Sequence, residues 1–140
     1  MIRQHSFVFR YCLLLTILLL LFPSLQATSD EQSPIDSLRK ALSNARTNDT
    51  LRVNLLNVLS VVLRSSSLRE AEQYANEARV LAQQLHFTRG EAEALWQLAY
   101  FASQRGNNDQ ALKLLQETKA LFEQLGDKAK VAKTTMNMGL

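Results

Sequence analysis

The sequence predicts an all-α protein built from antiparallel helical hairpins. Three observations lead to this prediction. The chain has no proline after Pro34, its apolar residues recur at spacings of three and four, and short polar or glycine-containing turns separate the apolar segments. No segment shows the alternation of apolar and polar residues that is typical of a strand.

The composition limits the classes of protein that fit. The 140 residues are enough for one domain of ordinary size. A formal net charge of +3, from 16 basic and 13 acidic residues, is too small to indicate a nucleic-acid or anionic-membrane partner. The single cysteine, Cys12, excludes an internal disulfide framework and a cysteine-based metal cage.

Residues 1–27 have the three-part pattern of a secretory signal peptide. A basic start is followed by the apolar run Tyr11–Phe22 and a helix-breaking Pro23, and Ala27 offers a small residue at a cleavage point. We expect cleavage after Ala27, because the run is shorter than the roughly 18–20 residues of a membrane span. The alternative is an uncleaved membrane anchor. Beyond this segment 14 basic and 13 acidic residues remain, so most of the net charge belongs to the leader.

A polar linker over 28–33 precedes the helical part of the chain, 34–140. Ser33–Pro34 predicts the start of an N-terminal helix over 34–47, since proline is tolerated at the first helical position. A first hairpin is expected over 50–85. Its second helix is expected to begin at the Ser67-x-x-Glu70 pattern of a capping box.

A second hairpin is expected over 88–125. Thr88-x-x-Glu91 resembles another capping box at its start, and Gly106 suits the left-handed residue that ends a helix. A third hairpin begins after Gly126-Asp127, and the segment 128–140 contains only its first helix.

The helical part repeats with a period of 40 residues. A shift of 40 superimposes apolar and small residues of both hairpins and of the turn between them: Ala71 on Ala111, Leu81 on Leu121, Leu85 on Leu125, Leu98 on Met138 and Ala99 on Gly139. A fixed period in this range is typical of stacked helical units that bury a shared core.

These residues resemble a tetratricopeptide repeat with a longer period. The resemblance lies in large–small pairs on the first helix of each unit and in small residues on the second, and it spans about residues 50–140. The positions are Leu59–Ser60, Leu98–Ala99 and Met138–Gly139 for the pairs, and Ala71, Ala75, Ala78, Ala111 and Leu115 for the second helices. The resemblance implies hairpins stacked as a short right-handed solenoid. HEAT-type hairpins are the alternative with a similar period.

The same resemblance implies a concave groove lined by the first helix of each hairpin, which would bind a protein or peptide. The groove positions are Asn57, Val61, Arg64, Trp96, Tyr100 and Gln104. Asn57 and Arg64 suit hydrogen bonds to a peptide backbone or carboxylate, and tryptophan, tyrosine and arginine are frequent anchors of binding surfaces. The alternative for the aromatic stripe is core packing against neighbouring hairpins.

Nothing in the sequence indicates an enzyme, a cofactor or a metal site. Patterns for a nucleophilic serine, a zinc protease, a phosphate loop or a dinucleotide fold are absent. His86, the one histidine after the leader, lies in a turn without carboxylates at metal-ligand spacing, and we expect no role for it.

The layout resembles the extracytoplasmic start of bacterial sensor histidine kinases and related regulators. The resemblance implies an exported, periplasmic or extracytoplasmic module, with further repeats, a membrane span and an output domain in the same longer protein. We expect the chain to be the front end of such a signal-transduction protein. The alternative is a freestanding assembly protein that self-associates through its open last repeat.

Overall fold

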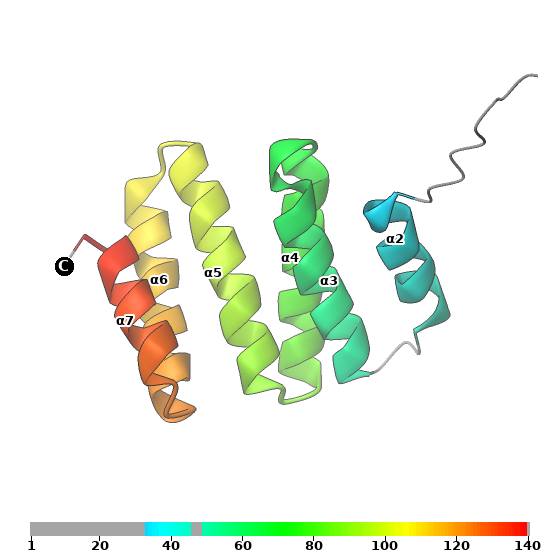
Figure 1. Ribbon diagram of the computed structural model, residues 1–140. Helices are drawn as coiled ribbons and strands as arrows, with labels where there is room; N and C mark the ends of the chain where they lie inside the picture. The colour runs from blue at the N-terminus through cyan, green and yellow to red at the C-terminus, as the bar shows by residue number, and fades with distance from the viewer. Residues whose placement is uncertain (1–32, 46–48, 140) are drawn as a thin grey trace, which may run out of the picture. The chain divides into compact units, whose positions relative to one another are not determined.

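The computed structural model describes residues 33–45 and 49–139, and these ranges contain helices and no strand. The expected leader, residues 1–27, lies outside the described residues. The α-helices are α2 (Pro34–Asn44), α3 (Thr50–Val62), α4 (Leu68–Gln84), α5 (Thr88–Gln104), α6 (Asn108–Gln124) and α7 (Lys128–Asn137), with a 3₁₀ helix, η1 (Leu63–Ser65), after α3. The all-α prediction is confirmed (Figure 1).

From α4 onward the helices start 20 residues apart, at Leu68, Thr88, Asn108 and Lys128. Each of α4, α5 and α6 has 17 residues, so each turn between them has three residues within the 20-residue spacing. The 40-residue period of the sequence is therefore two helix-plus-turn units of equal length.

The two turns between these helices and the turn between α6 and α7 have the same hydrogen bonds. In each, the N–H two residues past the C-cap position donates to a carbonyl oxygen five residues earlier, which is the Schellman arrangement. The pairs are Phe87 to Ala82 at 2.8 Å, Asn107 to Ala102 at 2.9 Å and Asp127 to Phe122 at 3.0 Å. Gly106 and Gly126 take the left-handed conformation that this turn requires, with φ of 74° and 68°. His86 takes the same place in the first turn with φ of 53°, in a region that favours glycine.

The residues that cap the helix starts agree only in part with those predicted from the sequence. Ser33, Asp49, Asn107 and Asp127 each accept a backbone N–H of the helix that follows. The capping boxes expected at Ser67 and Thr88 are not formed, because the Ser67 side chain makes no cap hydrogen bond and Thr88 is already the first residue of α5. The turn at His86 places Phe87 in the capping position instead.

The ends of two segments differ from the expectation. The N-terminal helix, expected over 34–47, ends at Asn44. At the other end α7 stops at Asn137, and Gly139 has φ of 74°. Met138 packs against the core, but Gly139 is not a helical position equivalent to Ala99. Glycine readily adopts the left-handed conformation that ends a helix.

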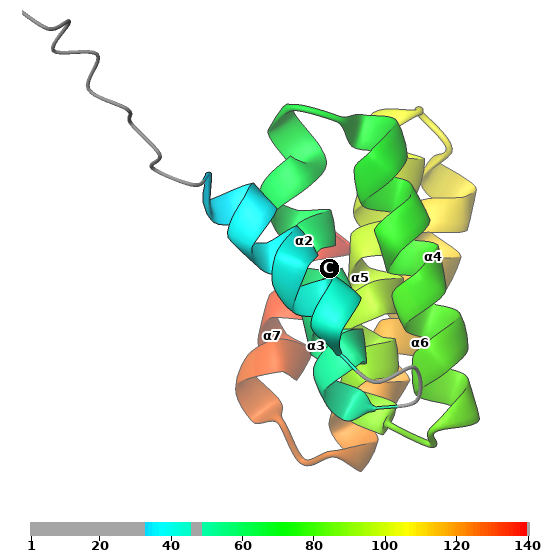
Figure 2. The ribbon, with the colours of Figure 1, turned by 90° about the vertical axis from the view of Figure 1, so that its right-hand side faces the viewer.

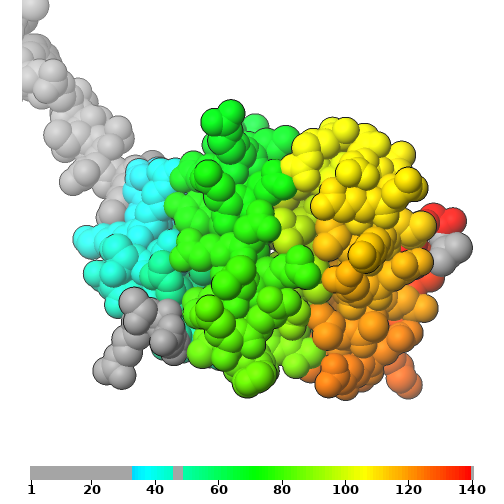
Figure 3. Space-filling model, turned by 180° about the vertical axis from the view of Figure 1, so that it is seen from behind, coloured from blue at the N-terminus to red at the C-terminus, as the bar shows by residue number. Residues whose placement is uncertain are grey.

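Each helix packs against the next along the chain, and α3 also packs against α5. In Figure 1 α5 lies between the α3–α4 pair and the α6–α7 pair, and the opposite face, with α4 and α6 at the surface, is seen in Figure 3. The helix α2 lies at the end of the stack in front of α3 (Figure 2). It packs against the core through Ile35, Leu38 and Leu42.

The core contains most of the residues that the repeat pattern singled out. The buried ones are Leu59, Ser60, Ala71, Ala75, Ala78, Leu98, Ala99, Ala111 and Leu115. Alanine recurs where helices meet, and a small side chain lets two helix backbones approach closely. Larger buried side chains, Phe101 and Phe122 above all, fill the remaining space. Within residues 33–45 and 49–139 no helix is long and apolar enough to span a membrane.

Candidate functional site

The described part of the chain has a groove of about 930 Å³ on the side of α3, α5 and α7. The middle is lined by α5, through Glu93, Trp96, Gln97, Ala99, Tyr100 and Ser103. One side comes from α3 and η1, and the other comes from α6 and α7. A groove of this breadth can hold a segment of another chain along α5.

Five of the six predicted groove residues line this groove: Asn57, Val61, Arg64, Trp96 and Tyr100. The sixth, Gln104, does not line it. It is the last residue of α5 and is exposed at that end of the helix. The arrangement brings the residues of α3 and α5 together across their helices, as the repeat register implied.

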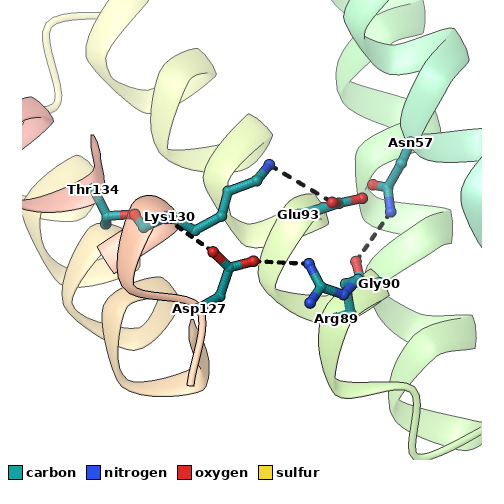
Figure 4. Close-up of polar contacts among 7 residues, drawn as sticks. All are labelled: Asn57, Arg89, Gly90, Glu93, Asp127, Lys130 and Thr134. Atoms are coloured by element: carbon teal, nitrogen blue, oxygen red, sulfur yellow. Dashed lines mark hydrogen bonds and ion pairs between the residues drawn. The ribbon is translucent and has the colours of Figure 1, made fainter. Parts of the chain in front are cut away.

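Asn57 has a different role from the one expected. Its side chain is only 4% exposed, and its Nδ2 donates a hydrogen bond of 3.0 Å to the carbonyl oxygen of Gly90 (Figure 4). The amide donor is thus used inside the protein, where it joins α3 to α5. The Oδ1 atom has no hydrogen-bond partner among the described residues.

The close approach of α3 and α5 depends on Gly90. A Cβ atom at this position would lie 2.6 Å from Cγ1 of Val53 and 2.5 Å from Cδ1 of Phe87, closer than real atoms pack. The absence of a side chain therefore lets α3 sit directly on the first turn of α5.

The equivalent contact between α5 and α7 is built differently. Trp96 follows Asn57 by 39 residues, and Lys130 follows Gly90 by 40 residues. Trp96 and Lys130 therefore occupy, one repeat later, the positions that Asn57 and Gly90 occupy between α3 and α5. Lys130 Nζ lies 5.0 Å from the centre of the Trp96 ring and 3.7 Å from Oε1 of Glu93. The buried amide hydrogen bond between α3 and α5 is thus replaced, between α5 and α7, by a cation on an aromatic face.

Further cations lie on the aromatic stripe. Lys133 Nζ is 4.7 Å from the centre of the Trp96 ring, and Arg64 Cζ is 4.9 Å from the centre of the Tyr100 ring. Trp96 also meets Phe122 edge to face, with ring centres 6.5 Å apart. The stripe therefore packs against Phe122 and also lines the groove.

The groove also has an apolar part. Val58, Val61 and Val62 on α3 and Leu112 on α6 are about two-fifths exposed and line it. Exposed apolar side chains that gather in one hollow are typical of a surface that receives a partner.

Residues of α6 and α7 also line the groove, although the sequence pattern did not predict them there. Lys130 and Lys133 could have been found from α7 itself, which has three lysines and no acidic residue. Leu112 was missed because only first helices were expected to line the groove. The helix α7 has 10 residues and runs along only part of the 17-residue α6, which leaves the start of α6 open (Figure 1).

An ion pair between Arg89 and Asp127 holds the start of α7. Arg89 Nη1 donates to Oδ2 of Asp127 at 2.9 Å, and Oδ1 of Asp127 accepts the backbone N–H of Lys130 at 3.1 Å (Figure 4). The hydrogen bond from Arg89, and then the backbone hydrogen bond, lower the pKa of the Asp127 carboxyl below its ordinary 3.8. The contact ties α7 to the first turn of α5.

Among the residues that the structure describes, no three His, Cys, Asp or Glu side chains gather where they could hold a metal ion. Comparison of the chain with protein-family models, with curated proteins and with solved structures gave no match.

Proposed function

We propose that the chain is a binding module that takes a protein or peptide segment in the groove along α5. The observation that carries the proposal is the meeting of Trp96, Tyr100 and Arg64 in one large hollow with an apolar wall. These residue types dominate the binding energy of many protein interfaces. The proposal assigns no chemical step to the chain.

The fold proposed for this module is a short right-handed solenoid of tetratricopeptide-like hairpins. It is supported by the equal 20-residue units, by the repeated Schellman turns and by the burial of Leu59–Ser60 and Leu98–Ala99. Proteins of this architecture stack hairpins so that each contacts only its neighbours.

The cellular setting proposed for the module is outside the cytoplasmic membrane. The support is the signal-peptide pattern of residues 1–27. In this proposal the module is the sensory or scaffold front end of a longer signal-transduction protein, as its resemblance to extracytoplasmic regulator segments implies.

A second candidate function is self-association through the outer side of α7. Met136 is 76% exposed, the highest value among the large apolar side chains that the structure describes, and Val131 and Ala132 line a smaller hollow beside it. Light scattering across a wide concentration range tests this candidate. A strict monomer, unchanged by Met136→Asp, would exclude it.

Selection from a phage-displayed library of random 12-residue peptides tests the groove. We expect the selected peptides, made synthetically, to bind the full chain and to lose at least tenfold in affinity to the Trp96→Ala, Tyr100→Ala variant. Tyr74→Ala is the matched control, since Tyr74 is half-buried on α4 and does not line the groove. Circular dichroism establishes that each variant is folded. Equal binding by the folded double variant, or failure to select any peptide, would contradict the proposal.

A further inference from the structure

Two cations in the groove have no carboxylate partner among the described residues. They are Arg64, from η1, and Lys133, from α7. Most other arginines in these ranges are paired, for example Arg89 with Asp127 and Arg52 with Glu77 at 2.8 Å. Lys130, which also lines the groove, is paired with Glu93. Arg64 and Lys133 are therefore available to an anionic ligand.

Aromatic rings hold both cations in place. The ring of Tyr100 lies under Arg64, and the ring of Trp96 lies under Lys133. A cation–π contact attracts the positive group without neutralising its charge, so a carboxylate can still bind the exposed side. The rings reduce the freedom of two long side chains before a ligand arrives, which lowers the entropic cost of binding.

The two cations lie on opposite sides of α5. Trp96 and Tyr100 are one helical turn apart, a rise of about 6 Å, and their cations come from η1 on one side and α7 on the other. An extended chain advances about 3.3 Å per residue, so the acidic side chains must be at least about two residues apart to reach both cations. Apolar side chains between them would meet Val58, Val62 and Leu112.

The net charge of the residues that line the groove favours an acidic ligand. Arg64, Lys130 and Lys133 are opposed by Glu93 and Asp109, which leaves one net positive charge. Glu93 is occupied by Lys130, and Asp109 lies in the first turn of α6. Asp109 is the one lining carboxylate that would oppose an acidic ligand.

We infer that the groove selects an acidic peptide segment and reads it through at least two internal side-chain carboxylates, at Arg64 and Lys133. The inference rests on the proposed function and narrows its ligand. Two carboxylates are required, because the single α-carboxylate of a chain end cannot contact two cations on opposite sides of α5.

The peptides selected from the phage library supply the probe, since their C-termini are fused to the coat protein during selection. We expect them to be enriched in Asp and Glu, and to bind the full chain when made with acetylated and amidated ends. Each of Arg64→Met and Lys133→Met should weaken binding about 3- to 10-fold, and replacing the peptide's Glu residues by Gln should do the same. Asp109→Asn should strengthen binding, and raised salt should weaken it.

Two matched variants control for a general loss of charge. Arg69→Met and Lys128→Met each remove one positive charge outside the groove, from α4 and α7, and should leave the dissociation constant unchanged. Isothermal titration calorimetry measures all of these constants on the same peptide.

The outcomes separate this inference from the proposed function. One result would overturn the inference alone. In it, the selected peptides are not enriched in acidic residues and need Trp96 and Tyr100, but they bind the Arg64→Met and Lys133→Met variants as tightly as the parent chain. Loss of binding on amidation of the C-terminus would also overturn it, as would equal affinity for a 12-residue thymidine oligonucleotide. Binding that ignores Trp96 and Tyr100 would overturn the proposed function itself.

Discussion

The side-chain amide of Asn57 donates a buried hydrogen bond of 3.0 Å to the carbonyl oxygen of Gly90, 33 residues later in the chain. It is a polar contact that joins α3 to α5 at Gly90, where a side chain would collide with Val53 of α3. The groove begins at this junction, because Asn57 lines it and Gly90 lets the two helices meet.

Asn57→Ala should lower the free energy of unfolding by about 1–2 kcal/mol, since it removes the hydrogen bond and leaves a small space. Asn57→Asp should cost more at neutral pH, because a carboxylate cannot donate to the carbonyl and its charge would be buried. Urea unfolding followed by circular dichroism measures both. Asn76→Ala is the matched control, as this exposed asparagine bonds only within α4, and its effect should stay within about 0.5 kcal/mol. An Asn57→Asp variant as stable as the parent would contradict this role.

Gly90→Ala should destabilise the chain by about 1–3 kcal/mol through overpacking, although alanine is the better helix former by about 1 kcal/mol. The added Cβ would meet Val53 and Phe87 at distances too short for carbon atoms. The Val53→Ala change should recover part of this loss in the Gly90→Ala background. In a Gly106→Ala background it should recover nothing, because Gly106 faces open space and is constrained only by its φ of 74°. A stabilising Gly90→Ala would disprove the close approach of α3 and α5.

His86→Gly should stabilise the chain by about 0.5–1 kcal/mol, because His86 holds the left-handed conformation that Gly106 and Gly126 hold at the same place in later turns. Part of the gain is offset by the greater freedom of glycine in the unfolded chain. The reverse change, Gly126→Ala, should destabilise by a similar amount. Thermal unfolding of the two variants against the parent gives the comparison, and a loss of stability in His86→Gly would rule out strain at this turn.

The Asp127 carboxyl should titrate below its ordinary pKa of 3.8, because Arg89 and the N–H of Lys130 donate to its charged form. Since folding lowers this pKa, the stabilising contribution is present above the unfolded value and is lost as the pH falls through the folded value. NMR titration of the Asp127 side-chain carbon measures the pKa directly.

Arg89→Gln should return the Asp127 pKa toward 3.8, because the hydrogen bond from Arg89 is the largest cause of the shift. Arg105→Gln is the matched control, since Arg105 pairs with Glu72 instead, and it should leave the Asp127 pKa unchanged. An Asp127 pKa that does not respond to Arg89→Gln would mean that the ion pair does not form in solution.

Much of the helical framework could be predicted from the sequence because its signals are local. Apolar spacing of three and four, the Ser33–Pro34 start and the glycines at 106 and 126 act within one or two turns of the chain. The capping box at Thr88 failed for an equally local reason, because the turn at His86 makes Phe87 the capping residue and Thr88 the first residue of α5. A pattern of residue types does not reveal which of two overlapping turn signals prevails.

The repeat register predicted which residues of α3 and α5 face the groove, and five of the six lie there. It could not show that the donor of Asn57 is used by Gly90, since that contact depends on how closely two helices pack. It also could not show Leu112 in the groove, which follows from the short length of α7 beside α6.

By itself, then, the sequence determined the helices, their order and the turns at Gly106 and Gly126, because hydrogen bonds within a helix and its turns join residues close in the chain. Only the tertiary structure decided that Lys130 and Lys133 lie on Trp96 and that Arg64 lies on Tyr100. These contacts join residues more than 30 positions apart. Their geometry depends on the distance and rotation between packed helices, which no single segment of the chain specifies.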